Sequence, residues 1–390
     1  MGKIEELIKQ LCPDGVKFVK LGDFFDMFKG MSKVSKKWAD TGNCKFIDYL
    51  NIYNNMTVDV TKLQNATVAT FKQNNLKEGD ILFTCASETP YECAISAVIR
   101  EPIAENTFLD DHLNGIRVKR EFEEIVLPAF INYYFYSVAF RKSICKIVRG
   151  VTRFYIVNKS FLNIMIPLPP LAVQKEIVEI LDTFTGMIDN LQKELEQRQK
   201  QFEYYRSKFF AYNEDECDWF SLPMISENCD RKRKPIKGSK REKGIYPYYG
   251  ASGIVDYVKD YILDGEYLLI SEDGANLVAR NTPIAFSIEG KNWVNNHAHV
   301  VKFNSLNDQR FVEYYFNSID LTPWISGGAQ PKLNQENLNK ILIPYPSVER
   351  RNIIVDTLKS FEALISNIKQ EIELRQKQYK YYREKLLTFE

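Results

Sequence analysis

The sequence repeats itself: residues 164–206 align without a gap with residues 341–383, at a spacing of 177 residues. Nineteen of these 43 aligned positions are identical, which is far above chance. A period of this length is too long for a solenoid, whose repeats span about 20–45 residues. The repeat therefore predicts two copies of one unit, related by an approximate two-fold axis within a single chain.

Weaker matches lie upstream of the repeated segment, in the same order in both copies. FINYYFYS at 130–137 matches FVEYYFNS at 311–318, and FLDDH at 108–112 matches WVNNH at 293–297. Each copy is therefore a variable part followed by a well-matched part. We expect variable globular parts at residues 1–165 and 213–345, and matched helical parts at residues 166–212 and 346–390.

An apolar repeat with alternating spacings of four and three runs through both matched parts. This 3.5-residue repeat is typical of a coiled-coil seam. Prolines at 167–170 and 344–346 suit the start of each helix. The alternative is two amphipathic helices that pack on separate cores. The predicted seam residues are Ile177, Leu181, Phe184, Ile188, Leu191, Leu195 and Phe202 in the first copy, and Ile354, Leu358, Phe361, Ile365, Ile368, Ile372 and Tyr379 in the second.

An arginine interrupts the apolar repeat once in each copy, at Arg198 and Arg375. Parallel helices in register would bring these two charges together in an apolar seam, which is costly. We therefore expect the helices to pack antiparallel. A helix of about 35–40 residues is roughly 50–60 Å long, so such a pair would hold the two globular parts at opposite ends.

Short β-rich runs separated by Gly, Asn and Pro turns indicate mixed α/β structure in both variable parts. We expect helices at 128–142 and 309–319 and strands such as 257–262 and 267–271. The predicted fold class is α+β. It consists of two tandem mixed α/β domains separated by an antiparallel coiled coil of two long helices, with internal pseudo-two-fold symmetry.

The whole chain is nearly neutral, with 52 Lys and Arg against 51 Asp and Glu. Affinity for nucleic acid would therefore have to come from local clusters of charge. Residues 231–243 (RKRKPIKGSKREK) carry eight basic residues and one acidic residue. Loops of this composition suit contact with phosphates; a solvated surface loop is the alternative.

The matching region of the first copy, residues 29–38, is basic to a lesser degree, and paired glycines at 150 and 327 are flanked by further polar and basic residues. Basic residues at the same place in both copies favour DNA binding over chance surface charge. The candidate DNA-binding residues are Lys33, Lys36, Lys37, Arg149 and Arg153 in the first copy, and Arg231, Lys232, Arg233, Lys234, Lys237, Lys240, Arg241, Lys243, Gln330 and Lys332 in the second.

Sequence signatures of catalysis are missing. There is no P-loop, no nucleophile elbow and no amino-methyltransferase tetrapeptide, and the seven cysteines and three histidines lack zinc-ligand spacing. We expect His112 and His297, which match between the copies, to be structural or contact residues. We expect no catalytic residue and no metal, and, since no apolar run approaches the ~20 residues of a membrane span, a soluble cytoplasmic protein.

Together these features resemble the specificity (S, HsdS) subunit of type I restriction-modification systems. The resemblance lies in PLPPLAVQKEIVEILD, in the helix tails RQKQFEYYR and RQKQYKYYR, and in YPYYGASGIVDYV with WVNNHAHV between residues 246 and 300. It covers nearly the whole chain. The second copy departs from the family pattern in one respect, because Arg351 stands where the first copy has Gln174.

The resemblance implies that each variable part is a target recognition domain that binds one half of a bipartite DNA site, with the coiled coil setting the spacer. It also implies two methyltransferase (M) subunits that bring S-adenosylmethionine, and restriction (R) subunits that use ATP and Mg. This chain would then be non-catalytic and hold no cofactor. The alternatives are a structural coiled-coil adaptor, against which the paired basic loops argue, and a self-contained DNA-modifying enzyme, against which the missing motifs argue.

Overall fold

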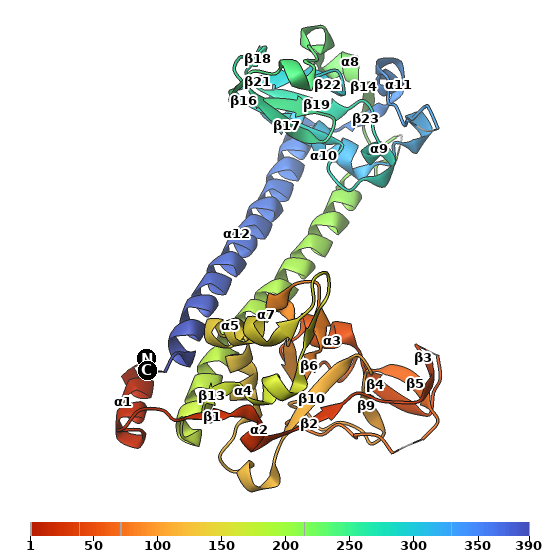
Figure 1. Cartoon of the computed structure of the whole chain (residues 1–390). Coiled ribbons are helices and arrows are strands. Elements are labelled where there is room, and N and C mark those ends of the chain that lie inside the picture. The colour runs from red at the N-terminus through yellow and green to blue at the C-terminus, as the bar shows by residue number, and fades with distance from the viewer. Residues whose placement is uncertain (1, 39, 71, 214, 329, 390) are drawn as a thin grey trace. The chain divides into compact units, whose positions relative to one another are not determined.

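The computed structural model describes residues 2–38, 40–70, 72–213, 215–328 and 330–389, and it divides into two compact units (Figure 1). Unit 1 comprises residues 1–190 and 372–390, and unit 2 comprises residues 191–371. The helices α7 (Leu171–Phe209) and α12 (Val348–Leu387) contribute to both units. The unit boundaries therefore fall within the long helices, whereas the sequence places domain boundaries at their ends.

The globular part of unit 1 contains two four-stranded sheets, with strand orders β2-β10-β6-β8 and β3-β5-β4-β9. Two smaller sheets, β11-β12-β7 and β1-β13, complete it. Its elements are α1 (Gly2–Leu11), β1 (Phe18–Lys20), α2 (Leu21–Phe24), β2 (Phe25–Lys29), β3 (Val34–Lys37), β4 (Cys44–Ile47), α3 (Tyr49–Asn54), β5 (Gln64–Val68), β6 (Ile81–Thr84), β7 (Ala86–Ser87), β8 (Ser96–Val98), β9 (Thr107–Leu109), β10 (Leu113–Val118), α4 (Pro128–Phe135), α5 (Val138–Ile147), β11 (Val148–Arg149), β12 (Phe154–Ile156), α6 (Asn158–Leu162) and β13 (Met165–Pro167).

The globular part of unit 2 contains sheets of order β15-β22-β19-β20 and β17-β16-β21-β18, and the pair β14-β23. Its elements are β14 (Asp218–Ser221), α8 (Leu222–Ile225), β15 (Glu227–Asn228), β16 (Lys243–Gly250), β17 (Gly253–Val258), β18 (Leu263–Asp264), β19 (Tyr267–Ser271), α9 (Asn276–Ala279), β20 (Ala285–Ile288), β21 (Lys291–Val294), β22 (Ala298–Lys302), α10 (Leu306–Ser318), α11 (Gln335–Lys340) and β23 (Leu342–Tyr345).

The two globular parts share much of their topology, so the internal repeat extends into the variable regions, although their second four-stranded sheets differ in one edge strand, β3 in unit 1 and β18 in unit 2. The sheet β15-β22-β19-β20 has the connectivity of β2-β10-β6-β8, and β14-β23 has that of β1-β13. The parallel pairs also correspond: Phe108 lies beside Phe46 in β9–β4, and its repeat equivalent Trp293 lies beside Tyr248 in β21–β16. This equivalence lets a site in one unit be compared with its counterpart in the other.

Each long helix begins on the hydrophobic core of its own globular part. In unit 1, Ile177 and Leu181 of α7 are fully buried in the cluster that holds Phe130. In unit 2, Ile354 and Leu358 of α12 are fully buried in the cluster that holds Phe311 and Leu268. The first turns of each helix therefore pack on a globular core, as the alternative of two separately packed amphipathic helices predicted for the whole helices.

Farther along, the two helices pack on each other, and they do so antiparallel. In unit 1, Phe184 of α7 stacks on Tyr382 of α12 with ring centroids 5.3 Å apart. In unit 2, Tyr205 of α7 stacks on Phe361 of α12 at 5.5 Å. Later residues of α7 thus contact earlier residues of α12, so the two helices are antiparallel, as predicted. The predicted seam side chains are all buried or half-buried. Arg198 belongs to unit 2 and Arg375 to unit 1.

Two local predictions need correction. The single helix expected at 128–142 is two helices, because Tyr136 ends α4 and Ser137 caps α5 by accepting a hydrogen bond from the Phe140 backbone N–H. The strand expected at 257–262 is β17, which ends at Val258. Within the described ranges, no helix has the length and apolar character needed to cross a membrane.

Candidate nucleic-acid interface

The basic segment of unit 2, residues 231–243, is fixed against strand β21. The Lys234 backbone N–H donates to the Val294 carbonyl at 3.1 Å, and the Trp293 indole N–H donates back to the Lys234 carbonyl at 2.6 Å. Farther on, the Ile236 N–H donates to the Tyr248 hydroxyl at 3.0 Å. The segment is therefore an ordered loop held beside the turn that follows β21.

The basic segment of unit 1, residues 29–38, is anchored at the equivalent place. The Met31 N–H donates to the carbonyl of Leu109 at 2.8 Å, and Leu109 is the repeat equivalent of Val294. Gly30 allows this approach, because a Cβ there would lie 1.8 Å from the Asp110 carbonyl oxygen. Both units thus place a basic segment against equivalent short strands, β9 and β21; in unit 1 part of this segment forms strand β3.

One cation in each basic segment lies over a buried aromatic ring, Phe46 of β4 in unit 1 and Tyr248 of β16 in unit 2. The Nζ of Lys37 is 5.9 Å from the centroid of Phe46, and the Cζ of Arg241 is 4.3 Å from that of Tyr248. Arg241 also pairs with Asp256 at 3.3 Å. Lys37 and Arg241 therefore have contacts within their own unit that help to hold the basic segments in place.

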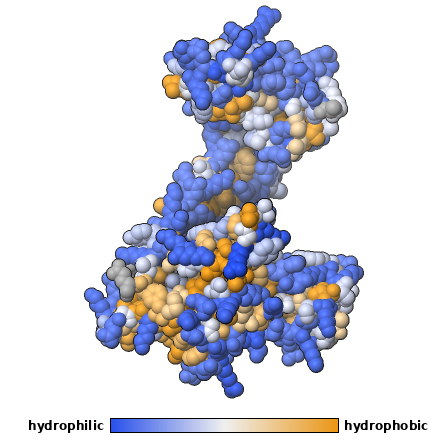
Figure 2. All heavy atoms as spheres, viewed as in Figure 1, coloured by the Kyte–Doolittle hydropathy of each residue, from blue (hydrophilic) through white to orange (hydrophobic). Residues whose placement is uncertain are grey.

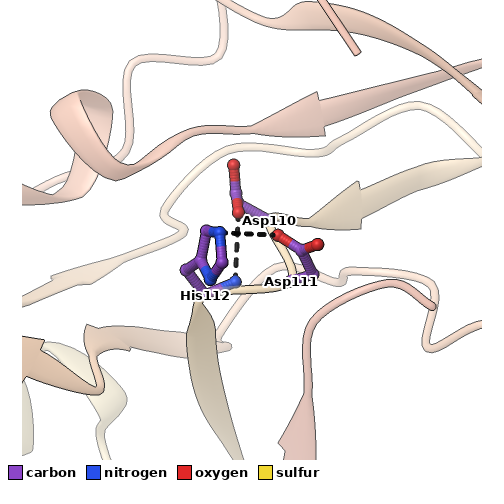
Figure 3. Close-up of side chains that lie close together, drawn as sticks. All are labelled: Asp110, Asp111 and His112. Carbon is purple, nitrogen blue, oxygen red and sulfur yellow. Dashed lines mark hydrogen bonds and ion pairs between the residues drawn. The ribbon is translucent and has the colours of Figure 1, made fainter. Parts of the chain in front are cut away.

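The turn after β9 consists of Asp110, Asp111 and His112 (Figure 3). The carboxylate of Asp110 accepts from the His112 backbone N–H at 3.1 Å, and Lys37 Nζ binds both carboxylates, at 3.2 Å from Asp110. Burial raises the pKa of Asp110. Burial also opposes ionisation of Asp111, but its hydrogen bonds to Asp110 and Lys37 prevail and lower its pKa.

This group offers three ligand atoms that lie within 4.8 Å of one another, as a metal site would. Lys37, however, already supplies positive charge to both carboxylates. The two carboxylates therefore have a counter-charge from within the unit. Asp111 and His112 remain exposed at the tip of the turn, with side-chain exposures of 38% and 80%.

The equivalent turn in unit 2 has amides in place of the carboxylates. The side-chain oxygen of Asn295 accepts from the His297 N–H at 2.8 Å, which repeats the geometry of Asp110 and His112. Asn295 is buried, whereas Asn296 and His297 are exposed. The imidazole of His297 pairs with Asp273 at 2.8 Å, beside the end of β19.

Each unit has a tight turn at one of the paired glycines, Gly150 in unit 1 and Gly327 in unit 2. Gly150 and Gly327 have φ angles of 131° and 84°, which favour glycine. A Cβ on Gly150 would lie 1.9 Å from the carbonyl oxygen of Arg153, and a Cβ on Gly327 would lie 2.5 Å from that of Gln330. These two turns are therefore repeat equivalents, and they present Arg149, Arg153 and Gln330 at the surface.

In unit 2 a network of charges joins the basic segment to the glycine turn. Glu272 pairs with Arg233 at 2.5 Å and with Lys332 at 3.1 Å. Arg233 also pairs with Asp230 at 3.1 Å. Burial works against the charge of Glu272, yet these cations prevail and lower its pKa. Arg233 and Lys332 are thus tied into the network, although the sequence suggested them as DNA contacts.

His299 lies beneath this network and was missed by the sequence reasoning. It is 1% exposed; its Nδ1 is 2.7 Å from Asp230 and its Nε2 is 2.8 Å from the Leu333 carbonyl. Both ring nitrogens therefore have a hydrogen-bond partner within unit 2. The sequence does not single out this histidine, because four consecutive residues of β22, Ala298–Val301, are buried and show no alternation.

The candidate residues therefore fall into two groups. Lys37, Arg233, Arg241 and Lys332 are held by carboxylates of their own unit. The others lie at the surface, and the visible face of the globular part that carries β16–β22 is mostly hydrophilic (Figure 2). The exposed candidates are Lys33, Lys36, Arg149, Arg153, Arg231, Lys232, Lys234, Lys237, Lys240, Lys243 and Gln330, and also Lys332, whose side chain is 50% exposed despite its ion pair.

The departure at Arg351 is accommodated locally. Gln174 donates to the Pro169 carbonyl at 2.7 Å, and Arg351 donates to the carbonyl of Pro346, the repeat equivalent of Pro169. Arg351 also pairs with Asp308 at 2.8 Å in the first turn of α10. The substitution thus keeps the link to the proline and adds an ion pair.

Comparison with known proteins gives consistent matches. A candidate type I restriction enzyme specificity subunit of Haemophilus influenzae is 38% identical over 183 residues, covering 45% of this chain and 47% of the relative, about half its length. The EcoprrI specificity subunit of Escherichia coli is 26% identical over 94% of this chain and 93% of its own length.

Solved structures share the fold. The crystal structure of the type I restriction-modification S subunit from M. genitalium matches with a TM-score of 0.59 at 14% identity, over 96% of each chain. The model of the type I restriction modification DNA specificity domain matches residues 13–198 and again residues 220–374. These two matches cover most of the sequence and coincide with its two copies. The chain therefore belongs to the type I restriction-modification DNA specificity domain family, and it carries the domain twice.

Proposed function

We propose that the chain is the DNA sequence-specificity subunit of a type I restriction-modification complex, in which each target recognition domain binds one half of a bipartite site. The observation that carries this proposal is the equivalent anchoring of two basic loops, at Leu109 in unit 1 and at Val294 in unit 2. Exposed lysines on an ordered loop suit phosphate contact, and the adjacent polar turns suit contact with base edges.

In this proposal the helices α7 and α12 set the unread spacer between the two half-sites. Their antiparallel stacking contacts, Phe184 with Tyr382 and Tyr205 with Phe361, support a stiff helical connection. Each helix is 39 or 40 residues long. Removing one heptad shortens a helix by about 10 Å, which corresponds to about three base pairs of DNA.

The same helices would dock two methyltransferase (M) subunits, one on each unit. Exposed apolar side chains recur at equivalent positions: Met187 corresponds to Leu364, and Tyr204 corresponds to Tyr381. Met187 and Tyr381 belong to unit 1, whereas Tyr204 and Leu364 belong to unit 2. Two matching sets of exposed apolar residues suit two copies of one partner.

We assign the chemistry of the complex to its other subunits. The M subunits would supply S-adenosylmethionine and methyl transfer, and restriction (R) subunits would use ATP and Mg. This chain would be non-catalytic and hold no cofactor, with its charged clusters serving structure and DNA contact. Because the substrate is DNA within the cell, the proposal places the complex in the cytoplasm.

The test is sequencing of methylated DNA from cells that express the chain with its cognate M subunit. We expect a bipartite motif, and a chimera with another relative's residues 13–165 should change one half of it only. Deleting residues 192–198 and 369–375 together should shorten the spacer and leave both half-sites intact. A motif unchanged by the chimera would overturn the proposal that the exchanged domain recognises a half-site. A spacer unchanged by the deletion would overturn the proposal that α7 and α12 set its length.

A further inference from the structure

We propose that the exposed tips of the two equivalent turns, Asp111–His112 in unit 1 and Asn296–His297 in unit 2, read base edges. The difference between Asp111 and Asn296 would then make the two half-sites differ in sequence. This inference rests on the proposed function and deepens it, since it names the residues that select the base at one equivalent position of each half-site.

The first support is that both turns are rigid and present the same two positions. Asp110 and Asn295 are buried, and each side chain accepts from the backbone N–H of the histidine two residues on, at 3.1 and 2.8 Å. The next two residues of each turn are exposed. A side chain held on a fixed backbone loses little entropy when it binds, which suits selective recognition.

The second support is the position of the turns beside exposed cations. The hydrogen bonds from Met31 to Leu109 and from Lys234 to Val294 bring each basic segment to the strand that leads into the turn. Lys33 and Lys36 in unit 1, and Lys234 and Lys237 in unit 2, are exposed on these segments. Lysines that bind phosphates would bring the tips of the turns to the groove.

The third support is that the carboxylates of unit 1 carry their own counter-charge. An acidic residue near DNA is repelled by the phosphates unless its charge is balanced. Lys37 binds both Asp110 and Asp111, and it is itself 19% exposed, so it is retained by the turn. The turn therefore keeps carboxylate oxygens as acceptors and lowers the electrostatic cost of bringing them to DNA.

The chemistry of the two tips selects different bases. A carboxylate accepts hydrogen bonds only, so Asp111 suits the amino group of cytosine. An amide both donates and accepts, so Asn296 suits N6 and N7 of adenine. Each good contact discriminates against a wrong base by about 1–3 kcal/mol. That range corresponds to roughly five- to 150-fold in binding.

The test exchanges the two side chains in the complete complex with its M subunits. Asn296→Asp and Asp111→Asn are compared with the parent by selecting bound sequences from DNA randomised across both half-sites. We expect Asn296→Asp to weaken binding of the parental sequence about tenfold or more, and to change preference at one position of the unit 2 half-site. Asp111→Asn should change one position of the other half-site.

Asn304→Asp is the matched control, because it makes the same change of charge at an exposed residue beyond the far end of β22. It should leave the selected sequence unchanged. A parental motif retained by both exchange variants would overturn the inference while leaving the proposed function intact. A uniform loss of binding to all sequences would also overturn it, by assigning the turn to phosphate contact. If the parent complex selects no sequence, the proposed function itself fails.

Discussion

Phe184 stacks on Tyr382 in unit 1, with ring planes 23° apart. Their repeat equivalents, Phe361 and Tyr205, stack in unit 2 at 26°. Each contact pairs a residue from the first copy with one from the second. The two copies therefore exchange helical segments, and each unit is completed by a piece of the other repeat.

This pairing predicts that Phe184→Ala lowers the free energy of unfolding by about 1–3 kcal/mol, because a half-buried aromatic contact is lost. Met187→Ala, on an exposed position of the same helix, should change it by less than about 0.5 kcal/mol. Denaturant unfolding of the full chain measures both. Equal effects of the two variants would contradict a specific stacking contact.

Removal of His299 should destabilise unit 2. His299→Asn removes the imidazole that bonds to both the buried Asp230 carboxylate and the Leu333 carbonyl. We expect a loss of about 2–4 kcal/mol in the free energy of unfolding. Hydrogen exchange should show the loss in β15 and β22 first. Protection of these strands equal to that of the parent would show that the ring contributes only packing.

Asp230 should also contribute to the acid sensitivity of the chain. Burial opposes its charge, but its bond to His299 prevails and holds the pKa below the ordinary value. The unfolded carboxyl therefore binds its proton more readily than the folded one. The stabilisation is complete above the unfolded pKa, about 4, and is lost as the pH falls through the folded value.

The variant that measures this effect is Asp230→Asn. It should be less stable than the parent near pH 7, and the difference should shrink progressively below about pH 4. Thermal unfolding across this pH range gives the comparison. A difference that stays constant down to strongly acidic pH would show that the charge of Asp230 contributes nothing.

Substitution by alanine should change the stability of the chain in opposite directions at Gly150, which lies in a tight turn, and at Gly186, which lies in a helix. Gly150→Ala meets the Arg153 carbonyl at 1.9 Å and requires an unfavourable φ, so we expect a loss of more than about 1 kcal/mol. Gly186→Ala lies within α7 with open space around its Cβ. It should stabilise the chain by about 0.5–1 kcal/mol. Differential calorimetry on both variants provides the measurement.

The sequence predicted the features that depend on local spacing. The 3.5-residue apolar repeat and the preceding prolines indicated both long helices, and the interrupting arginines indicated their antiparallel packing. It did not predict that Tyr136 and Ser137 would divide one helix into two. A serine within an aromatic run has no periodic signal, although its hydroxyl caps the next helix.

The candidate site was harder to predict because its contacts join distant segments. Asp230 and His299 lie 69 positions apart, and Lys37 lies 74 positions from Asp111. Composition marks Lys33 and Lys37 alike as basic, yet only tertiary structure separates an exposed lysine from one bound by two carboxylates. The FLDDH and WVNNH matches were visible in the sequence, but their position beside the basic loops was not.

The completion of unit 1 by residues 372–390 has a consequence for biosynthesis. Leu386 and Leu387 are buried in the same core as Phe130, although they leave the ribosome only after the whole of unit 2. Unit 2 is continuous in the chain and can close earlier. The two units are therefore expected to fold against the usual amino-to-carboxyl order, because the core of unit 1 is completed only after unit 2 has been synthesised.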